Sequence, residues 1–261
     1  MSDPRLTPDP ALVTTRRAAQ IGVPVADLCR RPDGPRDRQV LFGETVTVLN
    51  EASGWAYVEA EKDGYCGHVS QSSLTVPRVA THRVSVAATH VYANADLKTP
   101  DLLSLSYGAP VTVTTQTKDF AETAQGHIPR VHLAPIDQIE DDPAKIADLF
   151  LGTPYLWGGN SRWGIDCSGL VQAALLACGI PCPGDSDQQE ATVGKPVSDD
   201  YQRNDLLFWK GHVALVVDAE TMIHANAHKM AVSYEPIKDA IKRIEAGGDG
   251  PVTAHRRPDL P

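Results

Sequence analysis

Residues 152–184 read GTPYLWGGNSRWGIDCSGLVQAALLACGIPCPG. This segment predicts a tight turn followed by an apolar helix, with Asp166 as N-cap and Gly179 and Pro181 as the stop. Because the helix is apolar on nearly all sides, we expect it to be buried. Cys167 lies where the turn becomes the helix. Unpaired backbone N–H groups and the positive end of the helix dipole favour a thiolate there, so Cys167 is the candidate nucleophile.

The alternative for Cys167 is a small buried hydrophobic residue, which is what most free cysteines are. Cys178 and Cys182 fit that description better, since one lies late in the apolar helix and the other stands between two prolines. Glycines and aromatic residues crowd the approach to Cys167, as expected where a backbone must run close to a substrate. These residues are Tyr155, Trp157, Gly158, Gly159, Trp163 and Gly164. The pattern therefore favours the nucleophile.

Composition excludes several classes of function. The chain has 261 residues, with 24 Lys and Arg against 33 Asp and Glu, and it contains no basic run, so we expect no nucleic-acid partner. The N-terminal sequence MSDPRLTPDPALVTT has no signal pattern, and no apolar run is long enough to span a membrane. Five cysteines at irregular spacing argue against a disulfide framework. We therefore expect a cytoplasmic protein with no membrane partner.

A pair of cysteines and a pair of histidines superficially imitate a zinc finger. Cys178 and Cys182 would be combined with His224 and His228, but the segment 183–223 between the pairs is far too long for that motif. His224 also follows a strand-like run rather than a helix. We expect no metal site and no cofactor.

The sequence divides into four segments by composition and by apolar pattern. Residues 1–18 are rich in Pro, Asp and Thr and resemble a tail, whereas residues 19–76 are short apolar alternations broken by turns, which predict a small β-barrel. Residues 77–136 repeat this pattern, with Gly43 matching Gly108 at a shift of 65 positions. The remaining matches at that shift are Val46, Val48 and Trp55 with Val111, Val113 and Phe120, and a shift of 59 aligns Gly67, His68, Val69 and Leu74 with Gly126, His127, Ile128 and Leu133.

Residues 137–261 predict an α+β domain. Asp142 and Pro143 begin a helix, the helix of Cys167 follows, and after a polar stretch the chain forms strands interrupted by the amphipathic segment PIKDAIKRIEAG. Helices followed by strands indicate an antiparallel sheet packed on the Cys167 helix.

A nucleophilic thiol needs a base, and two of the nine histidines are well placed. His212 begins the apolar strand HVALVV, and His224 interrupts the strand TMIHANA after the short turn DAET. Neighbouring strands would point both imidazoles to the helix side, with His212 taking and returning the proton of Cys167 and His224 orienting it. Asn226, on the same strand face, is the rival orienting residue. The alternative for His212 is a solvent-exposed histidine at a strand end.

The runs DCSGLV, YLWGG, GHVALVV and IHANA resemble the NlpC/P60 family of cysteine peptidases over residues 137–261. With two bacterial SH3-like barrels in front, the chain is similar to the dipeptidyl-peptidase VI type, the γ-D-glutamyl-L-diamino acid endopeptidases of murein recycling. The resemblance implies a papain-like α+β catalytic domain with a Cys-His-His triad. It also implies cleavage between γ-D-Glu and the diamino acid of small murein peptides.

The same resemblance implies a substrate pocket in which acidic residues and a tyrosine hold the free amine of L-Ala and serines hold the D-Glu α-carboxylate. The matching runs LFGE, GYCG, DCSG and GDSDQQ supply Glu44, Tyr65, Asp166, Ser168, Asp185 and Ser186. For Glu44 the alternative is an exposed turn carboxylate. The first barrel is then expected to close one end of the cleft. An exported hydrolase of intact murein and a non-catalytic binding protein remain alternative functions.

Overall fold

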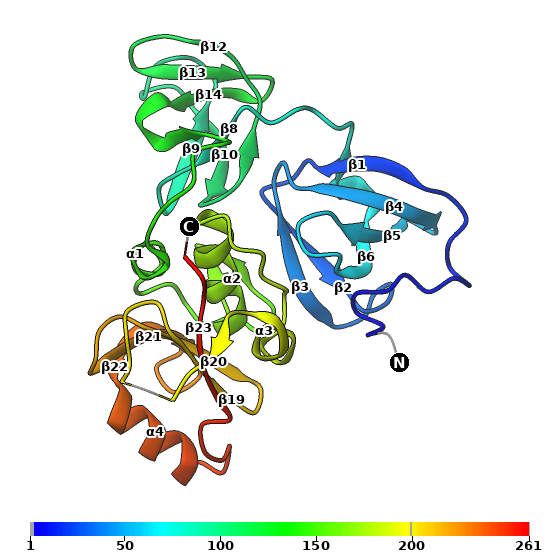
Figure 1. Cartoon of the computed structure of the whole chain (residues 1–261). Helices are drawn as coiled ribbons and strands as arrows, with labels where there is room; N and C mark the ends of the chain where they lie inside the picture. Colours follow the sequence, from blue (N-terminus) through cyan, green and yellow to red (C-terminus); the bar gives the residue numbers. More distant parts are fainter. Residues whose placement is uncertain (1–2, 199, 261) are drawn as a thin grey trace. The chain divides into compact units, whose positions relative to one another are not determined.

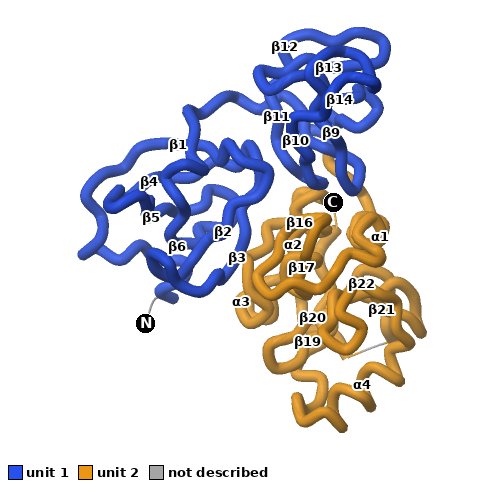
Figure 2. Tube along the Cα trace, turned by 180° about the vertical axis from the view of Figure 1, so that it is seen from behind, with its two compact units in different colours: residues 1–138 blue, residues 139–261 orange. Residues whose placement is uncertain are grey.

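The computed structural model describes residues 3–198 and 200–260. The chain divides into two compact units, Met1–Gln138 and Ile139–Pro261, which are coloured separately in Figure 2.

The first half of unit 1 is a β-module of seven strands. Their order is β3-β2-β6-β5-β4-β1-β7, and all the pairings are antiparallel. Alternating residues such as Val46, Val48 and Val58 are fully buried, which is the pattern expected of strands that curl around a core. The strands are β1 (Arg17–Ile21), β2 (Val25–Cys29), β3 (Arg36–Leu41), β4 (Thr45–Ala52), β5 (Trp55–Ala60), β6 (Cys66–Ser70) and β7 (Leu74–Thr75), with the 3-10 turn η1 (Gln71–Ser73).

The second half of unit 1 is a smaller β-module with a core of its own. Val84, Val91, Leu105 and Ile128 are fully buried in it, and Phe42 of the first module packs against the same cluster. Its elements are β8 (His82–Val84), β9 (Ala88–Tyr92), β10 (Asp101–Ser106), β11 (Pro110–Val111), β12 (Val113–Gln116), β13 (Phe120–Thr123), β14 (Gly126–Pro129), η2 (Arg130–His132) and β15 (Leu133–Pro135).

The two modules have the same strand order, in agreement with the repeat read from the sequence. The second module runs β10-β9-β14-β13-β12 and β11-β8-β15, which matches the first when β4 is broken into β11 and β12. Gly43 and Gly108 both have φ of +80°, a left-handed conformation that glycine adopts without strain. Val69 and Ile128 occupy equivalent, fully buried positions.

The segment predicted as a tail, residues 1–18, is shorter than expected. Strand β1 already begins at Arg17, and Leu6 packs against the core of the first module. Backbone groups also tie the segment down: the N–H of Cys66 donates to the carbonyl of Arg5, and the N–H of Asp9 donates to the Tyr57 hydroxyl. Its Pro-rich composition therefore marks irregular but packed chain.

Unit 2 is a mixed α/β fold built on a six-stranded sheet of order β18-β23-β19-β20-β21-β22. Helices α2 and α4 lie on opposite faces of this sheet (Figure 1). The elements are α1 (Pro143–Asp148), β16 (Asn160–Ser161), β17 (Gly164–Ile165), α2 (Cys167–Ala177), α3 (Ser186–Thr192), β18 (Lys195–Pro196), β19 (Leu206–Trp209), β20 (His212–Val216), β21 (Thr221–Asn226), β22 (Ala231–Pro236), α4 (Ile237–Ala246) and β23 (Ala254–Arg257).

Helix α2 forms as predicted, with Asp166 as its N-cap. The carboxylate Oδ1 of Asp166 accepts from the N–H of Gly169 at 2.6 Å, and Gly179 has φ of +71° just past the helix end. A Cβ at Gly169 would lie 2.5 Å from the carbonyl oxygen of Gly159, so only glycine lets the preceding turn lie against the helix. The helix is buried over most of its length and contacts β20 and β21.

Two details near the helices differ from the sequence interpretation. Asp142 precedes α1, but its carboxylate pairs with Arg203 at 2.8 Å, and the first turn is capped instead by Asn204, whose Oδ1 accepts from the N–H of Ala144. The polar stretch after α2, for which no element was predicted, contains α3, which starts with a capping box between Asp185 and Gln188.

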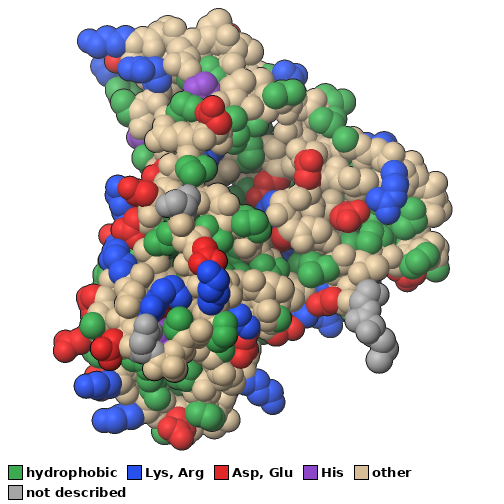
Figure 3. Space-filling model, viewed as in Figure 1, with side chains coloured by type: hydrophobic (Ala, Val, Ile, Leu, Met, Phe, Trp, Pro, Cys, Tyr) green, Lys and Arg blue, Asp and Glu red, His purple; other side chains and the backbone are tan. Residues whose placement is uncertain are grey.

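Within residues 3–198 and 200–260, no helix has the length and apolar character needed to cross a membrane. On the face shown in Figure 3, acidic and basic side chains are interspersed rather than gathered by sign.

Candidate active site

Cys167 lies close to strand β20 at the end where β20 and β21 are no longer paired. Strands β20 and β21 pair only at Leu215 with Ile223 and at Val216 with Met222, so their ladder ends before it reaches His212. The thiol of Cys167 lies in hydrogen-bonding reach of the backbone N–H of Val213, the residue that follows His212. The first turn of α2 therefore holds the thiol at the open end of this strand pair.

Burial of Cys167 opposes the thiolate that its position at the helix N-terminus favours. Burial and, to a smaller extent, the neighbouring Asp166 carboxylate raise the pKa of this thiol to about 12. Backbone N–H groups of Val213, Ser168 and Cys167 itself act in the opposite direction, as expected at a helix N-terminus, but they do not prevail. Only 7% of Cys167 is exposed, so the resting nucleophile is a thiol that has to be deprotonated.

The two predicted histidines are brought together. Nε2 of His212 lies 2.9 Å from Nδ1 of His224, with the ring centroids 5.1 Å apart. Desolvation lowers the pKa of His212 to about 3, and the neighbouring His224 and Arg243 lower it as well. The resting imidazole of His212 is therefore neutral and able to accept a proton.

The direction predicted for these imidazoles is wrong in one respect. Trp209 and His212 are paired directly across β19 and β20, and their rings lie 5.7 Å apart, so His212 is on the sheet face of Trp209. Trp209 and Met222 pack with Ile244 of α4. His224 lies two positions after Met222 on β21, so its side chain is on the same face of the sheet. Both histidines thus lie on the α4 face rather than the α2 face. Their link to Cys167 is Val213, the residue after His212, whose backbone N–H is close to the thiol.

Asn226, the rival orienting residue, has another position. Its side-chain Nδ2 donates to Ser233 Oγ at 3.0 Å, and its Oδ1 accepts from the N–H of Lys229 at 2.8 Å. These bonds close the turn between β21 and β22. Asn226 does not contact the ring of His212 among its hydrogen bonds in the described part of the chain.

Asp166 and Ser168, predicted to bind substrate, form the framework around the thiol. Oδ2 of Asp166 accepts from the N–H of Gly158 at 2.9 Å, and Oδ1 accepts from the Ser168 hydroxyl at 3.1 Å as well as from the first turn of α2. Both side chains are buried. The carboxylate therefore fixes the YLWGG turn to the start of the nucleophile helix, which accounts for an acidic residue directly before Cys167.

Asp185 and Ser186 lie at the start of α3. The Asp185 carboxylate accepts from the backbone of Gln188, whose side chain accepts from the N–H of Asp185 at 3.3 Å. Gln189 of the same helix donates from Nε2 to the carbonyl of Ser168 at 2.9 Å. Helix α3 is thus tied to the first turn of α2, which places Asp185 and Ser186 in the same neighbourhood as Cys167.

Glu44 and Tyr65 are found in unit 1. The Glu44 carboxylate is not a free turn carboxylate: it accepts from Lys62 Nζ at 2.8 Å and from the N–H of Leu41 at 3.1 Å. Tyr65 is buried, with the Arg38 guanidinium 5.9 Å from its ring centre. Any ammonium that binds Glu44 has to compete with Lys62.

Sequence reasoning missed three residues of this site. The phenol of Tyr155 interacts electrostatically with both Cys167 and Asp166. Burial, together with these two groups, raises the pKa of the phenol well above its ordinary value. Glu235 and Arg243 lie behind His224: Nε2 of His224 is 3.0 Å from Oε2 of Glu235, which pairs with Arg243 at 2.7 Å. Tyr155 was named only as part of an aromatic approach, and nothing in the sequence links the other two to the histidines.

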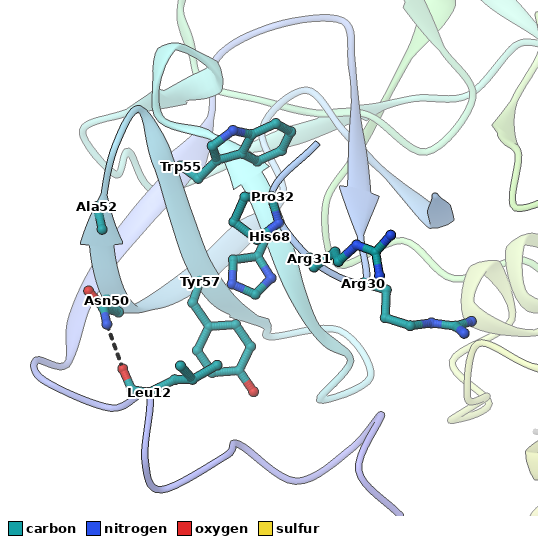
Figure 4. A pocket seen from close by; sticks show the side chains of 9 residues that line it. All are labelled: Leu12, Arg30, Arg31, Pro32, Asn50, Ala52, Trp55, Tyr57 and His68. Atoms are coloured by element: carbon teal, nitrogen blue, oxygen red, sulfur yellow. Dashed lines mark hydrogen bonds between the residues drawn. The ribbon is translucent and has the colours of Figure 1, made fainter. Parts of the chain in front are cut away.

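A separate pocket of about 400 Å³ lies on the first β-module (Figure 4). Its wall carries Trp55, Tyr57 and His68, with the last two rings 5.0 Å apart, and Arg31 and Pro32 border it. Neither Glu44 nor Tyr65 lines this pocket.

The five cysteines are free thiols. Within the described residues, no group of three or more His, Cys, Asp or Glu side chains is arranged to hold a metal ion.

A buried cysteine at a helix N-terminus, close to the backbone of the residue after a strand histidine that is itself bonded to a second imidazole, is the arrangement expected of a cysteine peptidase. Comparison with known proteins agrees. Residues 152–244 match the NlpC/P60 family, and residues 28–74 match the bacterial dipeptidyl-peptidase SH3 domain. The chain is 33% identical over 212 residues to the γ-D-glutamyl-L-lysine dipeptidyl-peptidase of Bacillus subtilis, covering 72% of this chain and 71% of that protein.

A second relative, dipeptidyl-peptidase 6 of Lysinibacillus sphaericus, is 27% identical over 214 residues, covering 72% of this chain and 79% of the relative. A crystal structure of an NlpC/P60 family protein from Bacillus cereus has the same fold, with a TM-score of 0.80 at 23% identity over 94% of this chain and all of that one. The chain belongs to the NlpC/P60 family of cysteine peptidases and carries an SH3 domain of the bacterial dipeptidyl-peptidase type.

Proposed function

We propose that the protein hydrolyses the bond between γ-D-Glu and the diamino acid in murein peptides that begin with a free L-Ala, releasing L-Ala-γ-D-Glu. The observation that carries this proposal is the similarity to γ-D-glutamyl-L-lysine dipeptidyl-peptidases across both the NlpC/P60 and the SH3 regions. The peptide substrate, a recycling role and a cytoplasmic location belong to the proposal.

The chemistry assigns Cys167 as nucleophile and His212 as base. Nδ1 of His212 takes the thiol proton as sulfur attacks the γ-carbonyl carbon, and the carbonyl electrons move to oxygen. When the tetrahedral intermediate collapses, the C–N bond breaks and His212 returns the proton to the leaving amine of the diamino acid. A water molecule, deprotonated by the same imidazole, then opens the thioester and regenerates the thiol of Cys167.

Two donors support the oxyanion in this scheme. The backbone N–H of Cys167 is a free donor of the first helical turn, and the Tyr155 phenol is kept protonated beside the thiol. We assign Tyr155 to this role because an elevated pKa keeps it a hydrogen-bond donor throughout the physiological range.

Recognition of the L-Ala ammonium is proposed for Asp185 together with Glu44 and Tyr65 of unit 1, and recognition of the D-Glu α-carboxylate for Ser168 and Ser186. A buried ammonium requires carboxylate partners to offset its desolvation. Asp166 is already bonded to three donors, so its role in this scheme is to hold the turn and Ser168 in place.

The test is product analysis. The full-length protein is incubated with L-Ala-γ-D-Glu-L-Lys, with L-Ala-γ-D-Glu-diaminopimelate and with intact sacculi, and the products are identified by mass spectrometry. Release of L-Ala-γ-D-Glu from the tripeptides but not from sacculi supports the proposal. Cleavage of sacculi at comparable rates would favour a wall hydrolase, and no cleavage of any substrate would favour a binding protein.

A further inference from the structure

Behind the histidine pair lies an ion pair that the scheme above does not use. Glu235 on β22 is diagonal to His224 on β21, since His224 is paired with Ser233. Its carboxylate is bonded to the imidazole at 3.0 Å through Oε2, and the Arg243 guanidinium holds both carboxylate oxygens, at 2.8 and 2.7 Å. His224 is fully buried, and the Glu235 side chain is 13% exposed.

We propose that Glu235 and Arg243 are positioning residues of the active site, which fix both histidines in the tautomer that leaves Nδ1 of His212 free to take the proton of Cys167. The proposal rests on the proposed function only in taking His212 as the base.

The hydrogen bonds that lead outward from the Glu235 carboxylate determine where the protons lie. An ionised carboxylate can only accept, so Nε2 of His224 has to carry its proton. A neutral His224 then presents a bare Nδ1, which accepts from His212, and Nε2 of His212 must be the donor of that 2.9 Å bond. The remaining nitrogen of His212, Nδ1, is left with its lone pair. A single carboxylate thus sets two tautomers.

Arg243 supplies the positive charge that balances the Glu235 carboxylate. A lone buried carboxylate would favour an imidazolium at His224, whose Nδ1 would then donate, forcing His212 to accept at Nε2 and carry its proton on Nδ1. That form of His212 cannot act as base. Arg243 matches the charge of Glu235, so no second positive charge is needed.

The charged and titratable groups around this carboxylate come from every element packed on it. They are His212 of β20, His224 of β21 and Arg243 of α4, with Asp249 after α4 acting on Arg243. Hydrogen bonds from Arg243 and His224 hold the pKa of Glu235 far below the usual range despite its partial burial. The carboxylate is therefore ionised at neutral pH.

The direct test is the tautomeric state of both histidines in the full-length protein without substrate, from long-range ¹H–¹⁵N correlations of ¹⁵N-histidine-labelled protein. We expect protons on Nε2 and bare Nδ1 atoms in both His212 and His224. A proton on Nδ1 of either ring would overturn the proposal. Because no peptide is involved, this result stands or fails separately from the proposed substrate.

Kinetics of Glu235→Gln give the second test. We expect kcat to fall at least about tenfold with KM changed less than about twofold, a smaller loss than the ~10⁴-fold seen when a carboxylate directly contacting a catalytic histidine is neutralised. Glu245→Gln, an exposed carboxylate on α4, is the matched control and should change nothing. In a His224→Ala background, Glu235→Gln should have no further effect on kcat. The same loss in both backgrounds would contradict a role through His224.

Arg243→Gln separates the two residues by pH. Without the guanidinium, His224 should become protonated as pH falls, so the variant should lose kcat toward acid pH and recover it toward alkaline pH. The loss of kcat in Glu235→Gln should not be recovered at alkaline pH. A pH-independent loss in Arg243→Gln would contradict the role assigned to Arg243.

Discussion

Nε2 of His212 lies 2.9 Å from Nδ1 of His224, although the backbone ladder between their strands has already ended. The side-chain bond between the imidazoles therefore connects the two strands where main-chain pairing has ended. The two histidines therefore differ in their hydrogen bonding. Both ring nitrogens of His224 are bonded, to His212 and to Glu235, whereas Nδ1 of His212 is left for the thiol.

His212→Ala should accordingly abolish turnover, because the proposed scheme passes the thiol proton to this imidazole alone. His224→Asn should retain measurable activity, since an orienting residue positions the imidazole without moving a proton itself. The measurement is kcat for each purified variant, with folding checked by circular dichroism. Equal losses would mean that His224 takes part in proton transfer.

The Cys167 thiol should react with iodoacetamide more rapidly as pH rises. With a pKa of about 12, the thiolate fraction and hence the labelling rate should increase about tenfold per pH unit from pH 7 to 9, without a plateau. Cys167→Ala should abolish both labelling and turnover, whereas Cys178→Ala and Cys182→Ala should keep activity within a few-fold. A labelling rate that is flat over this range would show a preformed thiolate.

Tyr155→Phe should lower kcat by about one to two orders of magnitude with little change in KM, as expected when one oxyanion donor is removed. Tyr234→Phe is the control: its hydroxyl donates to Asp148 at 2.6 Å, away from the thiol, and its loss should leave kcat within a few-fold. An unchanged kcat in Tyr155→Phe would remove this residue from the scheme.

Acid should destabilise the fold through His212. This imidazole is neutral when folded because its pKa is lowered from 6.5 to about 3, so the unfolded chain binds more protons between these values. The free energy of unfolding is therefore full above pH 6.5 and falls as pH decreases toward 3, by at most about 1.4 kcal/mol per unit from this group. His68 and His132, whose pKa values burial also lowers, act in the same direction.

Urea unfolding of the wild type and of His212→Gln between pH 7 and 4.5 checks this contribution. The variant should lose stability less steeply with acid, while the share due to His68 and His132 remains. Identical pH dependence in both proteins would contradict a buried neutral His212.

The sequence predicted the nucleophile helix and the repeated strand order, because N-caps, glycine positions and apolar alternation are local signals. Glu235 and Arg243 could not be predicted in the same way: they lie 11 and 19 positions beyond His224, and only strand pairing and the packing of α4 bring them together. The desolvation of Cys167 could not be predicted for a related reason. Helix position is visible in sequence, whereas the degree of desolvation depends on the strands that cover the thiol.

Glu44 is another case in which tertiary contacts change the expectation. Its carboxylate is paired with Lys62, so Glu44→Gln would remove an ion pair as well as a proposed ligand of the substrate amine. Lys62→Met is the control that separates these effects. If Glu44 binds the substrate ammonium, Lys62→Met should lower KM by relieving the competition, whereas Glu44→Gln should raise it. A rise in KM in both variants would mean that the pair only stabilises the module.

The central claim is that this peptidase requires a free amino terminus, and kcat/KM for L-Ala-γ-D-Glu-diaminopimelate against its N-acetylated form tests it most directly. Acetylation removes the charge that the carboxylates would pair with, so kcat/KM should fall by about two orders of magnitude or more, a loss of about 3 kcal/mol or more. Glu44→Gln should reduce this discrimination. Comparable kcat/KM values for the two peptides with the wild-type protein would contradict the claim and indicate a general hydrolase of wall peptides.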